Sequence, residues 1–147
     1  MGSVKIEGYE LRSGLYYDAL CDMWVSVSEG VAKVGYDPLG LEINGTLAQL
    51  GIARVGAIVS RGEVVGSLEA EKFVGPIVSP LSGRVIDANV EVLEDVSVLH
   101  RDPYGSWMFA VELSDASELE ELVTGDALAA SFAERLAAYR TKGVLAR

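Results

Sequence analysis

The sequence predicts a mainly β protein, a small barrel or sandwich followed by carboxyl-terminal helices. Short apolar runs between residues 47 and 66 are separated by Gly51, Gly56 and Gly62, as in small all-β folds. Alternating runs also lie on both sides of Lys72, and helical spacing of apolar residues appears only near the carboxyl end. With 147 residues, of which 50% are hydrophobic and 23% charged, the chain can form one domain with a core.

The first half of the chain contains one clear hairpin. Residues 1–20 have no clear period, and we expect an amino-terminal extension or a lead-in strand there. From Met23, the run MWVSVSEGVAKVGY alternates on both sides of a polar, glycine-containing turn at 28–30, which predicts two paired strands. Pro38 directly after Asp37 is a signal for a helix start or a turn.

The stretch from Ser67 to Gly83 organises the middle of the chain, because it places Lys72 between two strand-like runs. The run before Lys72 is EVVGSLEA, in which alternation puts Val64, Gly66, Leu68 and Ala70 on one side and Val65, Ser67 and Glu69 on the other. After Lys72, Gly75-Pro76 and the segment 80–83 interrupt the chain before a second alternating run, RVIDAN. The pattern predicts a hairpin with Lys72 at its tip, within a faint internal repeat of strand, glycine turn and strand.

Lys72 is the one lysine expected at a tip. The other three, Lys5, Lys33 and Lys142, fall in the extension, in a strand and in the carboxyl-terminal tail. An exposed amine on a tight turn can enter the active site of an attaching enzyme without unfolding the barrel. The alternative is an ordinary solvated lysine in a turn.

The carboxyl-terminal part is predicted to be helical. Ser117 and Glu120 form a capping-box pattern that opens a short acidic helix, and Gly125 ends it. Asp126 is expected to cap a second helix, in which apolar residues recur at spacings of four, four and three, at Leu128, Phe132, Leu136 and Tyr139. We expect this stripe to pack on the barrel, with a partner-docking face as the alternative.

Charge and cysteine content exclude several classes of function. A net charge of −10 is opposite to what sequence-independent nucleic-acid binding requires, and it suits a carrier that docks on basic partner surfaces. A single cysteine, Cys21, rules out an internal disulfide and fits a reducing cytoplasm. Neither a signal-like segment nor a run of about 18 apolar residues occurs, so we expect neither secretion nor membrane spanning.

Several segments together resemble the glycine cleavage system H protein family over roughly residues 22–123. They are Glu69 with Lys72 three residues later, Ser79-Pro80, Ser82-Gly83, VAKVGY, VLED, and DPYG followed by Trp107. The resemblance implies a flattened barrel of the biotinyl and lipoyl type (a barrel-sandwich hybrid), with lipoic acid on Lys72 and Glu69 as the glutamate of the attachment motif. It also implies one helical turn over 38–42, a β domain over residues 21–114, and carboxyl-terminal helices over 115–147 that pack on the barrel.

The sequence departs from the usual H-protein pattern around the expected arm. Asp22 stands where these proteins usually have a histidine, and FVGP follows Lys72 where they read A-x-S-D. With these features the chain looks more like a branch of H-like lipoate-binding proteins that serves sulfur oxidation. The resemblance thus implies a shuttle protein, not an enzyme, whose partners are a lipoate-attaching ligase or transferase, dihydrolipoamide dehydrogenase and a heterodisulfide-reductase-like complex. The alternatives are a glycine cleavage H protein that carries the aminomethyl group, and, more distantly, a biotin carrier or an unmodified binding module.

Two further residues are candidates near the arm. A lone His100, without cysteines or paired carboxylates at ligand spacing, gives no support for a metal site. The resemblance implies that His100 lies in the loop near the lipoyl arm, where it could contact the arm. Cys21 is interpreted as a small apolar residue, with a redox role toward the lipoyl thiols as the alternative. No catalytic constellation appears, so we assign no catalytic residue.

Overall fold

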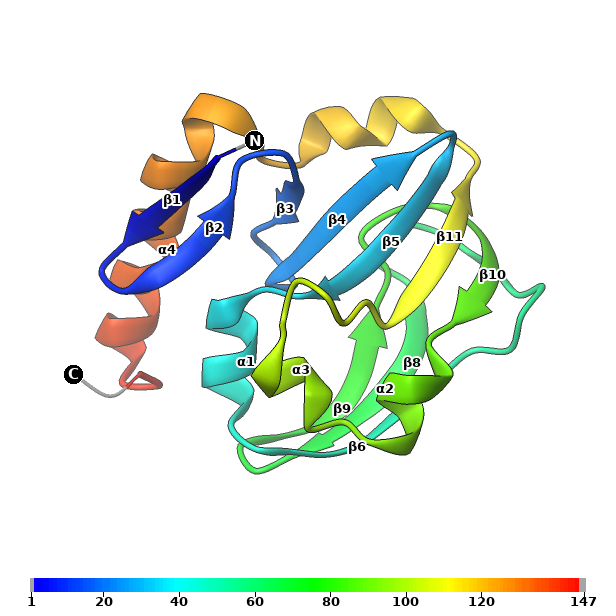
Figure 1. Ribbon diagram of the computed structural model, residues 1–147, viewed down its shortest axis with the longest axis horizontal. Coiled ribbons are helices and arrows are strands. Elements are labelled where there is room, and N and C mark those ends of the chain that lie inside the picture. Colours follow the sequence, from blue (N-terminus) through cyan, green and yellow to red (C-terminus); the bar gives the residue numbers. More distant parts are fainter. Residues whose placement is uncertain (1, 146–147) are drawn as a thin grey trace.

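The computed structural model describes residues 2–145, which form two packed β-sheets with helices at their ends and on one outer face (Figure 1). The strands are β1 (Ser3–Ile6), β2 (Tyr9–Arg12), β3 (Tyr16–Asp18), β4 (Met23–Ser28), β5 (Val31–Tyr36), β6 (Leu47–Ile52), β7 (Ile58–Val59), β8 (Val64–Ala70), β9 (Phe73–Val78), β10 (Gly83–Ala88) and β11 (Phe109–Leu113). The α-helices are α1 (Pro38–Asn44), α2 (Val90–Glu94), α3 (Val98–Arg101) and α4 (Leu128–Lys142). Two 3-10 helices, Ala116–Glu121 and Gly125–Ala127, precede α4.

The main core lies between a six-stranded sheet, ordered β3-β4-β5-β11-β10-β7, and a three-stranded sheet, ordered β6-β8-β9. Val34 and Val111 from the larger sheet and Leu68 and Ile77 from the smaller one are buried in one cluster. Val92 of α2 belongs to the same cluster, so this short helix covers one end of it. Two sheets that enclose a common core confirm the predicted mainly β, flattened barrel.

The predicted hairpin from Met23 to Tyr36 is confirmed as β4 and β5, which pair from Met23–Tyr36 to Ser28–Val31. Its two turn residues, Glu29 and Gly30, have φ of 52° and 78°. A two-residue turn with both residues in the left-handed region matches the twist of the flanking strands. The turn chemistry therefore sets the register of this hairpin.

A second apolar cluster lies on the outer side of the larger sheet. The predicted stripe of α4 is confirmed there, since Leu128, Phe132 and Leu136 are buried, and they pack with Trp24 and Leu11. Residues 3–12 form the β1–β2 hairpin, which lies alongside α4 in Figure 1. The β1–β2 hairpin and α4 thus contribute to the same apolar cluster. The domain boundaries expected at residues 20 and 114 stay predictions.

The strands beside Lys72 differ from the prediction in two ways. The alternation of EVVGSLEA is wrong at its start, because a β-bulge between Val64 and Gly66 leaves Val64 exposed and buries Val65. The second strand of the hairpin begins at once as β9, before RVIDAN, and it continues through Gly75-Pro76. Pro76 is tolerated because β9 pairs only with β8 and is an edge strand, where no ladder partner needs the missing N–H.

The predicted helix caps in the carboxyl-terminal part are wrong. Asp115, not Ser117, caps the first helix, and its carboxylate accepts the N–H of Ser117; the helix is of the 3-10 type. Asp126 lies inside a 3-10 turn, and α4 begins after Ala127 without a side-chain cap. A 3-10 turn leading into α4 replaces the cap, so capping motifs alone misplace the helix start by a few residues.

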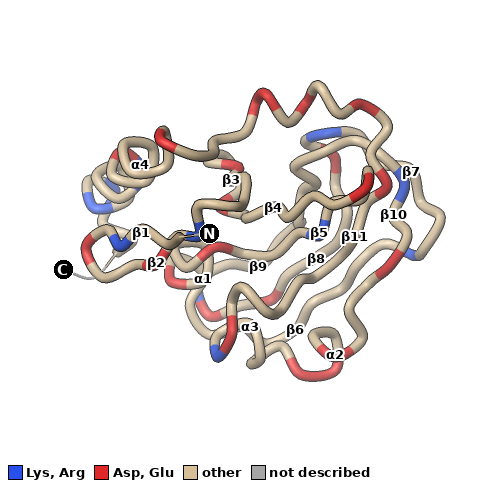
Figure 2. Tube along the Cα trace, turned by 45° about the horizontal axis from the view of Figure 1, so that its top comes forward, with Lys and Arg blue, Asp and Glu red and all other residues tan. Residues whose placement is uncertain are grey.

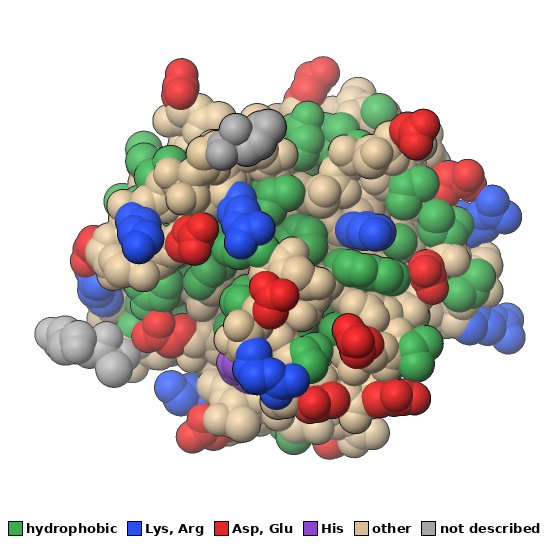
Figure 3. All heavy atoms as spheres, in the orientation of Figure 1, with side chains coloured by type: hydrophobic (Ala, Val, Ile, Leu, Met, Phe, Trp, Pro, Cys, Tyr) green, Lys and Arg blue, Asp and Glu red, His purple; other side chains and the backbone are tan. Residues whose placement is uncertain are grey.

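Charges of both signs are distributed along the described part of the chain (Figure 2). Acidic residues recur along the whole trace in Figure 2, and basic side chains are interspersed with acidic and hydrophobic ones on the face drawn in Figure 3. Within residues 2–145 no group of three potential metal-ligating side chains occurs. In the same part of the chain, none of the helices has the length and apolar character needed to span a bilayer.

Candidate functional site

Lys72 lies in a two-residue turn between β8 and β9, directly after the pair formed by Ala70 and Phe73, as predicted for a hairpin tip. Its side chain is exposed, and among residues 2–145 no carboxylate forms an ion pair with it. The backbone of the turn, in contrast, is fixed. The N–H of Lys72 donates to the carbonyl oxygen of Asn44 at 2.9 Å, and the N–H of Glu71 donates to that of Thr46 at 2.8 Å. The structure therefore presents a free amine on a rigid support.

The support is the end of α1, where Gly45 terminates the helix with a φ of 75°. A Cβ at this position would lie 2.6 Å from Glu71 Oε1 and 3.0 Å from Glu71 Cβ, so only glycine fits against the turn. Glu71 Oε1 also accepts the N–H of Thr46 at 3.2 Å. The sequence analysis missed this role of Glu71. The glycine that ends α1, Gly45, was a signal in the sequence that another segment packs closely there.

The helix α1 begins with a strong cap and runs two residues beyond the predicted turn at 38–42. The carboxylate of Asp37 accepts the N–H of Gly40 at 2.9 Å, and Pro38 occupies the first turn. At the other end, the side-chain amide of Asn44 donates to the carbonyl of Gly40 at 2.9 Å. Both ends of α1 are therefore held by side-chain hydrogen bonds, which makes it a defined spacer between Asp37 and the lysine turn.

A buried ion network fixes the start of α1 to α4. Arg135 donates to Asp22 at 2.5 Å and to Asp37 at 2.8 Å, and its side chain is only 10% exposed. Tyr139 also donates to Asp22. Burial and the neighbouring Asp37 raise the pKa of Asp22, although Tyr139 and Arg135 act in the opposite direction. Nothing in the sequence pattern joins these residues, because the packing of α4 brings them together across 98 to 117 positions.

An apolar hollow of about 250 Å³ lies on one side of the lysine turn, and we call it the β9 groove. Its walls are the β3–β4 connection at 20–23, the end of α1 at 43–44, Tyr36, and the edge strand β9 at Phe73 and 76–78. A second hollow of about 200 Å³ adjoins it and shares Leu20, Cys21 and Val78. Two residues of its walls adjoin Lys72: Asn44 accepts the backbone N–H of Lys72, and Phe73 is the next residue in the chain. The groove therefore opens beside the lysine.

Cys21 lines this groove, in surroundings that disfavour its thiolate form. Burial, followed by the nearby charge of Asp18, raises the pKa of Cys21. The thiolate is the nucleophilic form of cysteine, so this environment suppresses thiol–disulfide exchange. The side chain acts here as a small apolar group, in agreement with the first of the two interpretations.

A more polar hollow of about 460 Å³ lies on the other side of the turn, and His100 borders it together with Glu71, Glu42 and Tyr9. His100 is exposed at its position in α3, and its Nε2 accepts the N–H of Leu47 at 3.2 Å. This hydrogen bond requires an unprotonated Nε2. The structure thus brings His100 to the neighbourhood of the turn, while its contact with an arm stays a prediction.

Glu69 is exposed on the outer face of the three-stranded sheet, in β8, opposite Val74 of β9. It borders a shallow hollow of about 380 Å³ that also includes Gln49. Its carboxylate lies on the same hairpin as Lys72 and is open to an approaching protein.

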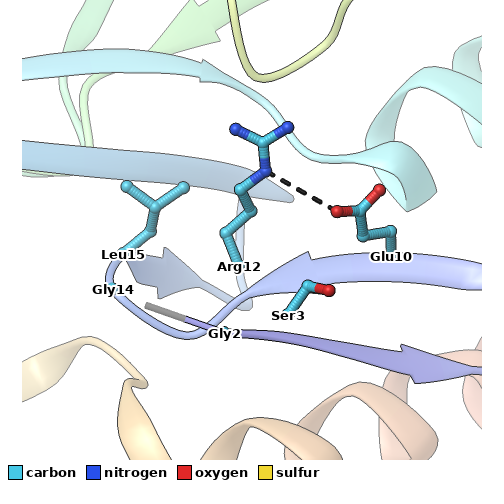
Figure 4. A pocket seen from close by; sticks show the side chains of 6 residues that line it. All are labelled: Gly2, Ser3, Glu10, Arg12, Gly14 and Leu15. Atoms are coloured by element: carbon cyan, nitrogen blue, oxygen red, sulfur yellow. Dashed lines mark ion pairs between the residues drawn. The ribbon is translucent and has the colours of Figure 1, made fainter.

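A further hollow, of about 520 Å³, lies at the amino-terminal hairpin, and Figure 4 shows the side chains around it. Its one charged pair is Arg12 with Glu10, 3.7 Å apart and largely exposed. None of its lining residues borders the lysine turn, so we do not assign it to the site.

Comparisons with known proteins agree in one family. The model of the glycine cleavage H-protein family matches residues 15–135. A glycine cleavage system H protein from Thermoanaerobacter sp. (strain X514) is 35% identical over 117 residues, which cover 80% of this chain and 92% of the relative. A probable glycine cleavage system H protein 2 from Sulfolobus acidocaldarius is 36% identical over 120 residues, which cover 79% of this chain and 80% of the relative.

Solved structures give the same result for the fold. The crystal structure of a glycine cleavage system H protein from Mycobacterium marinum matches with a TM-score of 0.74 and 26% sequence identity. The match covers 84% of this chain and 99% of that one. The family match over residues 15–135 includes the hairpin with Lys72 at its tip and the helix α1 that supports it.

Proposed function

The chain belongs to the glycine cleavage H-protein family, and we propose that Lys72 is the residue that carries its lipoyl group. Proteins of this family carry lipoate covalently on a lysine, and they are carriers, not catalysts. The single observation that favours Lys72 is its place in the β8–β9 turn, with an exposed side chain and a backbone fixed to α1. Lys5, Lys33 and Lys142 lie in β1, in β5 and at the end of α4, where no comparable turn presents them.

The proposed chemistry needs three groups of this chain. The amine of Lys72 forms an amide with the carboxyl group of lipoic acid, and Glu69 on the same hairpin is read by the attaching ligase or transferase. The rigid turn then holds the base of the arm while its dithiolane end moves. Because the arm is tethered, its effective concentration at successive active sites is high.

Within this role, we propose that the arm carries the aminomethyl group between the glycine cleavage enzymes and is reoxidised by dihydrolipoamide dehydrogenase. The relatives described above are glycine cleavage system H proteins, and this supports the glycine cleavage alternative over the sulfur-oxidation prediction. The partners supply the catalysis. A cytoplasmic location, predicted from the single cysteine, fits this role.

Mass spectrometry tests the attachment. Protein purified from its native host is analysed intact and as peptides, beside a Lys72→Arg variant that keeps the charge but cannot form the amide. We expect a lipoyl amide on Lys72 that is absent from the variant. Biotin on Lys72, or an unmodified lysine while the partner enzymes are active, would refute the proposal.

A second candidate keeps the lipoyl arm but changes the pathway to sulfur oxidation with a heterodisulfide-reductase-like complex. The observation that favours it is the composition of the β9 groove, which Phe73, Pro76 and Cys21 make apolar where the arm would rest. Reconstitution distinguishes the two candidates. Glycine-dependent release of carbon dioxide with the lipoylated protein supports glycine cleavage, whereas its absence, with oxidation of the dihydrolipoyl arm by the reductase-like complex, supports sulfur oxidation.

A further inference from the structure

The lysine turn is held by a short connection, residues 44–47, that joins α1 to β6. The carbonyl oxygen of Asn44 accepts the N–H of Lys72. Thr46 makes two contacts with Glu71, since its carbonyl oxygen accepts the N–H of Glu71 and its own N–H donates to Glu71 Oε1. Any movement of residues 44–47 therefore reaches the turn on which Lys72 stands.

The two ends of this connection are fixed in different ways. At the first end, the side-chain amide of Asn44 donates to the carbonyl of Gly40 within α1 at 2.9 Å. At the other end, the N–H of Leu47 donates to Nε2 of His100 at 3.2 Å. His100 lies in α3, which borders the same polar hollow as α1 (Figure 1) and is anchored by Leu99, a fully buried residue of the main core. A side chain on an anchored helix thus holds the start of β6.

The contact between Leu47 and His100 depends on the protonation of the imidazole. Nε2 accepts the N–H of Leu47 only while it is unprotonated, because both ring nitrogens of the charged form are donors. Histidine ordinarily changes its charge between about pH 5 and pH 8, and His100 is the only histidine of the chain. A proton taken up by Nε2 from solvent therefore removes the acceptor of the Leu47 N–H.

Two carboxylates border the polar hollow together with His100. They are Glu42 of α1, which also accepts the hydroxyl of Tyr9 from β2, and Glu71 of the lysine turn. A protonated imidazole can donate to either carboxylate, and at Glu71 it would compete with the N–H of Thr46. Protonation thus weakens the connection at two neighbouring residues. The other charged groups on these elements are Lys72 on the turn, Arg101, which pairs with Asp95, and Asp102, which accepts the N–H of Gly105.

We propose that His100 is a positioning residue of the lysine turn, and that it acts through the backbone of β6 in a proton-dependent way. With a neutral imidazole, Leu47 is held and the turn keeps its geometry. With a protonated imidazole, the N–H of Leu47 loses its acceptor, Glu71 meets a competing donor, and the turn is held less firmly. This inference rests on the proposed function in that Lys72 is the residue to be presented, and it adds a control of that presentation by pH.

Amide hydrogen exchange tests this coupling in the full chain with unmodified Lys72. The protection of the Leu47, Glu71 and Lys72 amides, corrected for the intrinsic exchange rate, is measured by NMR from about pH 7.5 to about pH 5.5. We expect the protection of all three amides to fall by about threefold to tenfold, as the loss of one hydrogen bond predicts. The amide of Met108, which donates to the carbonyl of Val34 in the core, reports global opening and should not change.

Two substitutions of the exposed His100 serve as rescue and probe. In His100→Gln, the amide oxygen replaces Nε2 with an acceptor that does not titrate, so protection should stay high across the pH range. In His100→Ala no acceptor remains, so protection should be low throughout. Attachment of lipoate by the ligase gives a second readout, compared between His100→Gln and the unsubstituted protein at each pH so that the pH dependence of the ligase cancels. The two rates should be equal at about pH 7.5, and His100→Gln should be at least about twofold faster at about pH 6.

Unchanged protection of the three amides over this range would overturn the inference, and so would a change at Leu47 that does not extend to Lys72. The same pH dependence in His100→Gln as in the unsubstituted protein would also overturn it, because another group, such as Asp22 with its raised pKa, would then be responsible. Exchange is measured without the lipoyl amide. A failure of attachment in mass spectrometry would therefore refute the proposed function and leave the exchange result in place.

Discussion

The backbone N–H of Lys72 donates to the carbonyl oxygen of Asn44, the last residue of α1, at 2.9 Å. This hydrogen bond joins the tip of the β8–β9 hairpin to a helix that is itself capped by Asp37 and, through Arg135, fixed to α4. The lysine that we propose as the attachment site thus stands on a continuous support that reaches to the carboxyl-terminal helix. A mobile amine on a fixed backbone is what an arm needs at its base.

Gly45→Ala should distort the turn and slow lipoylation. The substitution adds a Cβ that meets Glu71 at 2.6 Å and forces a left-handed residue, so we expect a loss of about 1–3 kcal/mol in the free energy of unfolding. Gly30→Ala is the control, since it has a φ of 78° but open space around it. Urea unfolding and the rate of ligase-catalysed attachment measure the two effects. Equal attachment rates in the two variants would contradict the role of Gly45 in positioning Lys72.

Arg135→Met should destabilise the fold strongly. It leaves Asp22 and Asp37 buried without their cation, for which we expect about 3–5 kcal/mol from urea unfolding. Arg140→Met removes the exposed pair with Glu7 instead and should cost less than about 1 kcal/mol. Adding Asp22→Asn to Arg135→Met should recover part of the loss. Similar losses for the two single variants would show that the buried network is not what holds α4.

Cys21 should react slowly in the folded protein. Burial raises the pKa of its thiol, so at pH 8 the thiolate population and the rate of alkylation by iodoacetamide are expected to be at least about tenfold below those in urea. Cys21→Ala should leave oxidation and reduction of the lipoyl arm unchanged. Rapid alkylation of Cys21 in the folded protein would instead support the redox alternative. So would a loss of oxidation and reduction of the lipoyl arm in Cys21→Ala.

Alkaline pH should unfold the protein cooperatively. Burial is the main cause that raises the pKa of four tyrosines, Tyr17, Tyr36, Tyr104 and Tyr139. It also raises the pKa of Tyr9 to about 12. An unfolded tyrosine ionises near its ordinary value of 10, so the folded state binds more protons above that pH, and stability falls as the pH rises further. Circular dichroism and tyrosinate absorbance should therefore change together. Tyr139→Phe removes one of these groups and should reduce the slope of stability against pH above 10; an unchanged slope would contradict the assignment.

Glu69→Gln should slow lipoate attachment without affecting the fold. The side chain is exposed on the lysine hairpin, so we expect a drop of about tenfold in kcat/KM for the ligase and an unchanged melting temperature. Glu120→Gln is the control, at an exposed position on the carboxyl-terminal 3-10 helix. If both variants are attached as fast as the unsubstituted protein, Glu69 is not read by the ligase.

Local patterns were sufficient for much of this protein. The alternation of residues 23–36 around Glu29-Gly30, the stripe of α4 and the position of Lys72 in a tight turn all follow from backbone and side-chain preferences within a few residues. The same local reasoning failed where a single residue shifts the register, as at the bulge between Val64 and Gly66. It also placed the second strand of the lysine hairpin too late, at RVIDAN, because it could not recognise β9 as an edge strand that accepts Pro76.

By itself, then, the sequence determined the class of fold, the lysine tip and the apolar face of α4, since each depends on neighbours in the chain. Only the tertiary structure decided what the tip rests on and what lies beside it. Arg135 meets Asp22 across 113 positions, and Lys72 meets Asn44 through a hydrogen bond between backbone atoms that every residue possesses. Contacts of this kind depend on how sheets and helices pack in space, and no spacing of side-chain types along the chain specifies them.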